Sequence, residues 1–174
     1  MKGLAYIDET LILPEAKASD KWELITQMVE RAVSSDPIQE QKDAISRELI
    51  LDGVMEREHE RGTGLGNGVA FPHARIPGLK SPLVCVAFPA PPVNFESIDD
   101  KPVFIAVLIL VPEDQPQTAL QIMSQFARLL SDPVEREALM GLKTVSGLCG
   151  YVVRHVLEKD ASVTACDIMR EPVA

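Results

Sequence analysis

Aromatic side chains and positive charge are both scarce in this chain. Phe, Trp and Tyr together make up 5% of the 174 residues, which is too few for a stacking surface along single-stranded nucleic acid. Lys and Arg number 17 against 26 Asp and Glu, so the net charge is −9. This balance opposes the clustered basic surface that a phosphate backbone requires. We therefore expect no nucleic-acid partner and a core of aliphatic side chains.

Cysteine is scarce as well. The chain has three cysteines, none of which forms a close pair: Cys85, Cys149 and Cys166. An odd number without a CxxC or zinc-type spacing predicts reduced thiols. Cys85 lies inside an apolar run, where we expect it to pack as a small apolar side chain.

Long apolar runs are absent from the start of the chain. The acids Asp8 and Glu9 interrupt the first apolar residues, which excludes a secretion signal or a membrane span there. The overall composition, 46% hydrophobic and 25% charged, is that of a globular protein of one domain. We expect a cytoplasmic protein without direct membrane insertion.

Apolar residues at helical spacing predict a series of helices. They cover residues 19–35, a stretch from 36 to about 58, residues 117–130, a short helix from 132, and a last helix from 145 to about 159. The second stretch contains Ser46 and Gly53, so it forms either two helices or one broken helix. At its start, Asp36 is expected to be the N-cap, with Pro37 next and Gln39 completing a capping box.

Three apolar segments predict strands: 69–71, 83–88 and 103–111. Because the residue before a proline is held extended, His73 should stand where the first strand ends. The preceding RGTGLGNG, residues 61–68, predicts a shaped loop without regular structure. Helices and strands mingle along the chain, so the class is α/β or α+β, with helices packed on a sheet.

The glycine-rich loop leads to His73, the main candidate for chemistry. The loop lacks the GxGxxG and GK[ST] patterns of nucleotide sites, and no GxSxG nucleophile is present. A neutral imidazole at His73 can instead serve as a nucleophile, with Arg57, Arg61 and Arg75 nearby in the sequence to bind phosphate oxygens and lower its pKa. A structural surface histidine is the alternative.

The other two histidines favour structural interpretations. His155 lies near a predicted helix C-terminus, where a positive imidazole interacts favourably with free carbonyls. His59 sits among charges, and no known metal-binding spacing links it to His73 and to Glu56 or Glu60. We expect no metal and no other cofactor.

The segment RGTGLGNGVAFPHAR, residues 61–75, closely resembles the active-site signature of a known family. It is similar to the type-2 IIA domains of the bacterial phosphoenolpyruvate:sugar phosphotransferase system (the fructose and mannitol class), with the nitrogen-regulatory IIA protein as the nearest branch. The resemblance extends from about Ala5 to Leu157. It implies a three-layer α/β fold with a mixed sheet flanked by helices. It also implies that His73 accepts a phosphoryl group from a histidine phosphocarrier protein (HPr-like).

The same resemblance suggests roles for other residues. Arg57 falls on the family's phosphoryl-stabilising arginine, with Arg61 as the competing assignment, and the supporting residues are Gly66, Asn67, Gly68 and Arg75. Many members carry a second active-site histidine at the start of a later helix, where this chain has Ala119. The nearest polar side chain on that helix is Gln121, which is therefore a further supporting candidate.

Three functions follow as hypotheses. The first is a regulatory phosphoryl carrier that signals to target proteins through its phosphorylation state. The second is a IIA-like binding module without chemistry, and the third is the IIA component of a fructose- or mannitol-type transporter with a permease as its partner. Residues 1–160 are assigned to the IIA-like domain. Residues 161–174 resemble the start of a CBS-like domain, with a frayed C-terminus as the alternative.

Overall fold

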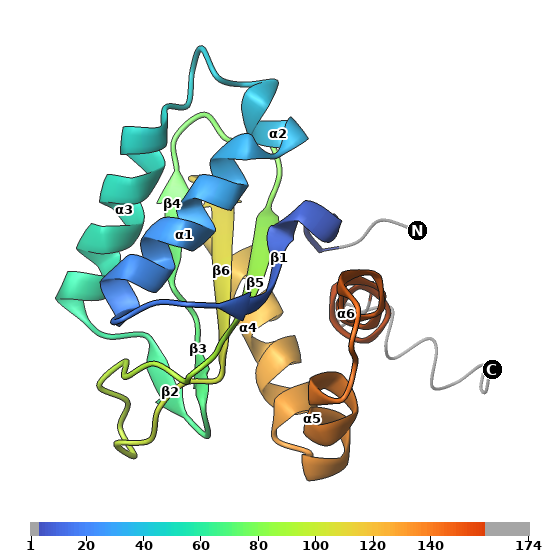
Figure 1. The fold of residues 1–174 in the computed structure, drawn as a ribbon. Helices are drawn as coiled ribbons and strands as arrows, with labels where there is room; N and C mark the ends of the chain where they lie inside the picture. The colour runs from blue at the N-terminus through green and yellow to red at the C-terminus, as the bar shows by residue number, and fades with distance from the viewer. Residues whose placement is uncertain (1–3, 159–174) are drawn as a thin grey trace.

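The computed structural model describes residues 4–158, which form one open mixed sheet between two layers of helices (Figure 1). This is the three-layer α/β fold that the family resemblance implies. The elements are η1 (Glu9–Leu11), β1 (Ile12–Ala16), α1 (Lys21–Ser34), α2 (Asp36–Gln39), α3 (Arg47–Glu60), β2 (Gly64–Gly66), β3 (Val69–Ala70), β4 (His73–Ile76), β5 (Leu83–Pro89), β6 (Ile105–Pro112), α4 (Pro116–Leu130), α5 (Pro133–Met140), α6 (Val145–Val152) and the π-helical η2 (Val153–Leu157).

Strand β6 is the centre of the sheet. The strand order is β1-β5-β6-β3-β2, and β4 also pairs with β6. Strand β5 runs antiparallel to β6, whereas β3 and β4 run parallel to it. Every residue of β5 and β6 is buried, as expected for strands covered on both faces.

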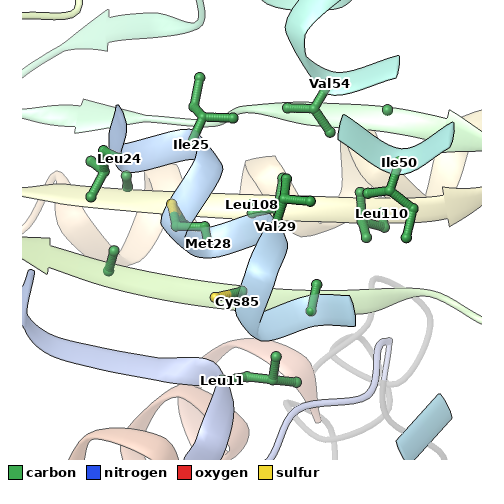
Figure 2. Packing of buried hydrophobic residues seen from close by; sticks show 14 of the residues in the cluster. Leu11, Leu24, Ile25, Met28, Val29, Ile50, Val54, Cys85, Leu108 and Leu110 are labelled. Carbon is green, nitrogen blue, oxygen red and sulfur yellow. The ribbon is translucent and has the colours of Figure 1, made fainter. Parts of the chain in front are cut away.

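The two faces of the sheet pack against different helices. On one face, α1 and α3 cover side chains of β5 and β6 that include Cys85, Leu108 and Leu110 (Figure 2). On the other face, α4 and α6 cover the alternate side chains, among them Val107 and Ile109. The burial of Cys85 is complete, so its predicted role as an apolar core residue is confirmed.

The predicted start of the second helical stretch is wrong by one residue. Two helices form, α2 and α3, but Ser35 rather than Asp36 stands at the N-cap of α2, and no side chain caps that helix. The reason is that Ser35 also ends α1, where its hydroxyl donates to the carbonyl of Ala32. The chain passes from one helix into the next through this single extended residue, so Asp36 is already helical.

The glycine-rich segment is more regular than predicted. Residues 64–66 form β2, which pairs antiparallel with β3. The two residues between the strands, Asn67 and Gly68, have φ angles of 59° and 80°. An Asn-Gly pair with two positive φ angles is typical of a tight hairpin turn, which the expectation of an irregular loop did not take into account.

The prediction that His73 ends a strand is also wrong, because His73 begins β4. Val69 lies opposite Ile105 and His73 lies opposite Ile109, so the register along β6 is the same in β3 and β4. The two strands are separated only at residues 71 and 72, where Pro72 has no N–H to donate to a neighbouring strand. Pairing resumes immediately after the proline.

Strand β1 was not predicted, because Pro14 lies in its middle and β1 is the outermost strand beside β5. Proline is tolerated in such edge positions. The predicted tail at 161–174, including Cys166, lies outside the described residues.

Candidate functional site

His73 is the first residue of β4, and its side chain faces the α4 side of the sheet. Its strand neighbours Ala74 and Ile76 belong to the core beneath α1 and α3. Since side chains alternate along a strand, His73 and Arg75 project to the opposite side. Both line a hollow of about 480 Å³ that lies between α3 and α4.

The hydrogen bonding of His73 determines which of its ring nitrogens is free. Its Nδ1 lies 2.8 Å from the carbonyl oxygen of Phe71. A carbonyl can only accept, so Nδ1 carries the proton and donates it, which leaves the lone pair of Nε2 available. The break between β3 and β4 makes this bond possible, because His73 turns back to the residue two positions earlier.

Burial lowers the pKa of His73 below its usual value, and the positive charge of Arg57 lowers it further. The hydrogen bond to Phe71 and the charge of Glu58 act in the opposite direction. The imidazole is half-buried. The balance favours a neutral ring at neutral pH, which is the form that can act as a nucleophile.

The two candidate arginines of the α3 end are placed differently. Arg57 lines the hollow that contains His73, and its Nη1 donates to the carbonyl oxygen of Arg61 at 2.8 Å. Arg61 is the exposed C-cap residue of α3, and its side chain is not among those lining that hollow. Arg57 is therefore the guanidinium that shares the hollow with His73, together with Arg75.

The hollow also contains two acids that the sequence reasoning did not assign to a phosphate site. Glu56 and Glu60 lie one helical turn apart on α3 and line it beside Arg57. Two acidic and two basic side chains therefore line the same hollow. Glu56 and Glu60 are four residues apart, so they lie on the same face of the helix, and Arg57 lies between them in the sequence. This spacing could have identified them as neighbours of Arg57 in the hollow.

The α4 wall of the hollow is apolar at the position where the family resemblance placed a missing histidine. Ala119 is buried and lines the hollow together with Pro116, Leu120 and Met123. Gln121 is exposed and lines two other hollows instead. The structure thus brings Ala119 to His73 but does not bring Gln121 there.

The glycine hairpin lies beside a second, smaller hollow. Gly66 and Asn67 line a space of about 140 Å³ next to Phe71 and the end of α4. The N–H of Asn67 donates to the carboxylate of Asp99 at 2.9 Å, which holds the turn. These residues do not line the His73 hollow. If they support His73, they do so by shaping the backbone that leads to it.

A buried polar group beside the hairpin was missed altogether. Lys21 and Glu58 are 5% and 2% exposed and lie 3.1 Å apart. Glu58 also accepts hydrogen bonds from the N–H and the hydroxyl of Thr63. We call these three residues the Glu58 cluster. No sequence signal marks it, because charged residues on helices are usually exposed.

The remaining histidines pack on aromatic rings. His59 stacks on Trp22 with ring centroids 4.3 Å apart, and His155 stacks on Tyr151 at 4.2 Å. Between residues 4 and 158, no three His, Cys, Asp or Glu side chains come together in a way that could hold a metal ion. Within the same residues, no helix combines the length and apolarity needed to cross a membrane.

The arrangement can hold a phosphate-sized anion next to Nε2 of His73, because guanidinium groups bind phosphate oxygens in a bidentate manner. The protein is thus a three-layer α/β protein in which His73, Arg57 and Arg75 line one hollow. Residues 5–152 match the family described as "Phosphoenolpyruvate-dependent sugar phosphotransferase system, EIIA 2", and the chain belongs to this family.

Similar proteins carry both regulatory and sugar-related names. A nitrogen regulatory protein of Pseudomonas aeruginosa is 34% identical over 106 residues, which cover 61% of this chain and 69% of that protein. A fructose-specific EIIA component of Haloferax volcanii is 38% identical over 94 residues, which cover 54% of this chain and 61% of that protein.

Solved structures agree with the fold. The crystal structure of the nitrogen regulatory protein IIA-Ntr from Neisseria meningitidis has a TM-score of 0.73 and 26% identity, covering 83% of this chain and 94% of that one. The Escherichia coli mannitol enzyme IIA, solved in complex with phosphorylated enzyme IIB, has a TM-score of 0.66 and 18% identity, covering 84% and 96%. At this identity the likeness concerns the fold alone.

Proposed function

We propose that this chain is a cytoplasmic phosphoryl carrier that accepts a phosphoryl group on Nε2 of His73 from a histidine phosphocarrier protein. The observation that carries the proposal is the free Nε2 of a neutral His73 in the hollow that Arg57 and Arg75 also line. Family membership supports the identity of the donor.

In the proposed step, the Nε2 lone pair attacks the phosphorus atom of the donor's phosphohistidine. The new P–N bond forms as the donor's P–N bond breaks, and the donor nitrogen keeps the electron pair. Nδ1 keeps its proton and its bond to the Phe71 carbonyl throughout. Arg57 and Arg75 stabilise the charge on the equatorial oxygens, which is the main requirement of phosphoryl transfer.

The partner of the phosphorylated form is either a regulatory target or a permease component. Names of both kinds occur among the relatives. The added charge of a phosphoryl group would change what binds around the hollow, where Glu56 and Glu60 already lie. The regulatory role is our first choice, and the IIA component of a sugar transporter is the second, supported by the similarity to a fructose-specific component.

The test is phosphorylation with phosphoenolpyruvate, the general phosphotransferase enzyme and the histidine phosphocarrier protein. Wild type should gain the mass of one phosphoryl group in an acid-labile form, and His73→Gln should gain none. The matched control His155→Gln should be labelled like wild type. Equal labelling of wild type and His73→Gln would overturn the assignment, and no labelling of wild type would favour a binding module without chemistry.

A further inference from the structure

The Glu58 cluster is linked by hydrogen bonds to His73 and Arg57, although it forms no hydrogen bond with either side chain. One carboxylate oxygen of Glu58 accepts the Thr63 hydroxyl at 2.6 Å, and the other accepts the Thr63 N–H at 3.0 Å. Lys21 Nζ lies 3.1 Å from the same carboxylate. All three residues are buried. Burying an ion pair is costly unless its hydrogen bonds are satisfied, and here Glu58 has a partner for each oxygen.

A chain of hydrogen bonds leads from this cluster to His73. The carbonyl of Thr63 accepts the N–H of Phe71 at 3.1 Å. The carbonyl of Phe71 in turn accepts Nδ1 of His73 at 2.8 Å. The links before the imidazole are backbone groups of the buried residues Thr63 and Phe71, so a shift of Thr63 is passed on to His73.

A second route leads to Arg57. The carbonyl of Arg61, two residues before Thr63, accepts Nη1 of Arg57 at 2.8 Å. The position of this carbonyl depends on how the chain leaves α3 and enters the hairpin. Glu58 holds the chain between α3 and the hairpin in place. It belongs to the last turn of α3 and accepts a hydrogen bond from Thr63 five residues later.

We propose that Glu58 is a positioning residue, which holds Thr63 so that the two backbone carbonyls orienting His73 and Arg57 stay fixed relative to each other. Lys21 balances the charge of the Glu58 carboxylate. The effect of Glu58 on the rate of phosphoryl transfer rests on the proposed function. The structural effect of Glu58, the fixed orientation and tautomer of His73, does not depend on phosphoryl transfer.

The kinetic test uses the phosphorylated histidine phosphocarrier protein as the donor. Glu58→Gln loses one acceptor for Thr63, and the apparent kcat should fall about 10- to 100-fold, as is usual when a supporting hydrogen bond is lost. The KM for the donor should change less than about twofold, because a buried residue does not contact a docking protein. Thr63→Val should act in the same direction, whereas Thr63→Ser, which keeps the hydroxyl, should retain most of the rate.

The control for a merely structural role is Val54→Ala, a fully buried position of α3 outside the cluster. All variants are assayed at a temperature where circular dichroism shows each to be folded. If Val54→Ala, at an equal or larger loss of stability, lowers kcat as much as Glu58→Gln, the positioning role is overturned. Should Glu58→Gln not fold, the Thr63→Val and Thr63→Ser pair decides on the same criterion.

A second readout separates this inference from the proposed function. The ¹⁵N chemical shifts of the His73 imidazole report which ring nitrogen carries the proton in the unphosphorylated protein. Wild type should be the Nδ1–H tautomer, and Thr63→Val and Glu58→Gln should shift the population towards Nε2–H, while Val54→Ala should not. An unchanged tautomer in both variants overturns the inference, even if wild type is phosphorylated normally. A shifted tautomer supports it, even if wild type takes no label.

Discussion

The centre of the sheet and the segment that carries the site are built in different ways. Strands β5 and β6 are held by apolar side chains buried on both faces. The segment from Gly62 to Ile76 is shaped instead by a few individual groups, namely the positive φ angles of the hairpin turn, the missing N–H of Pro72 and the Glu58 cluster. The difference teaches that the centre determines stability, whereas single local groups determine where His73 points.

The largest expected effect is a loss of stability when a large side chain is removed from the centre of the sheet. Leu108→Ala removes a fully buried side chain from β6, and we expect a loss of about 2–5 kcal/mol in the free energy of unfolding. Urea unfolding measures this loss. The control Leu120→Ala, at an exposed position, should change stability little. The fraction of Leu108→Ala that remains folded should still accept a phosphoryl group at the wild-type rate, and a lower rate would contradict the comparison.

A smaller loss is expected at the hairpin turn. Gly68 has a φ angle of 80°, and a Cβ there would lie 2.1 Å from Cε2 of the Phe104 ring. Strain and overlap together should cost Gly68→Ala about 2–4 kcal/mol in urea unfolding. Gly78→Ala is the matched control, because Gly78 also has a positive φ but the nearest atom is at 3.9 Å. Equal losses for both variants would mean that Phe104 does not constrain the turn.

Arg57→Met should impair the chemistry more than the fold. Removing one group that stabilises transferring charge commonly costs about 100-fold in rate, and we expect this for phosphorylation of His73. The free energy of unfolding should change by less than about 1 kcal/mol, because Arg57 is only half-buried. Arg61→Met is the control, and it should retain most of the rate. A larger effect at Arg61 would transfer the stabilising role to that residue.

Gly53→Ala should stabilise the protein. Gly53 lies inside α3, and an added Cβ would meet the Ala74 Cβ at 3.5 Å, which is an ordinary contact. Alanine is favoured over glycine within helices by about 0.5–1 kcal/mol, so the urea midpoint should rise by a corresponding amount. A decrease would show that α3 and β4 are packed too tightly for one methyl group.

The last expected effect concerns pH. Because the folded-state pKa of His73 is lowered, the unfolded chain takes up a proton first as the pH falls below about 7. Wild type should therefore lose stability relative to His73→Gln over the interval between the two pKa values, by at most about 1.4 kcal/mol per pH unit. Urea unfolding of both proteins between about pH 8 and 5 measures the difference. A gain in the relative stability of wild type on acidification would contradict the sign of the shift.

The sequence predicts the apolar centre of the fold better than the segment that carries the site. Strands β5 and β6 and helices α1, α4 and α6 could be recognised, because continuous or periodic apolar residues carry their own signal. Strand β4 could not, since Pro72 hides the continuation of the β3 register along β6. The N-cap of α2 was misplaced because Ser35 closes one helix and opens another.

The site was predictable only in part. His73, Arg57 and Arg75 were recognised as candidates, and the fold brings them to one hollow. The spacing of Glu56 and Glu60 on either side of Arg57 could have indicated that they share the hollow, but the sequence could not indicate that Gln121 faces elsewhere. It also could not indicate the Glu58 cluster, because Lys21 and Glu58 are far apart in sequence and their burial depends on tertiary contacts.

The pause in pairing at Phe71 and Pro72 makes the length of this segment critical. The residue count between Ala70 and His73 decides which side of the sheet each side chain of β4 occupies, since neighbours alternate. One extra residue there, with the backbone of β4 held in place, would put His73 at the present position of Ala74 and Ala74 at the present position of Arg75. The imidazole would then point into the core beneath α1 and α3, to which Ala74 now belongs. Such an insertion would leave the order of the strands intact and still remove the nucleophile from the hollow.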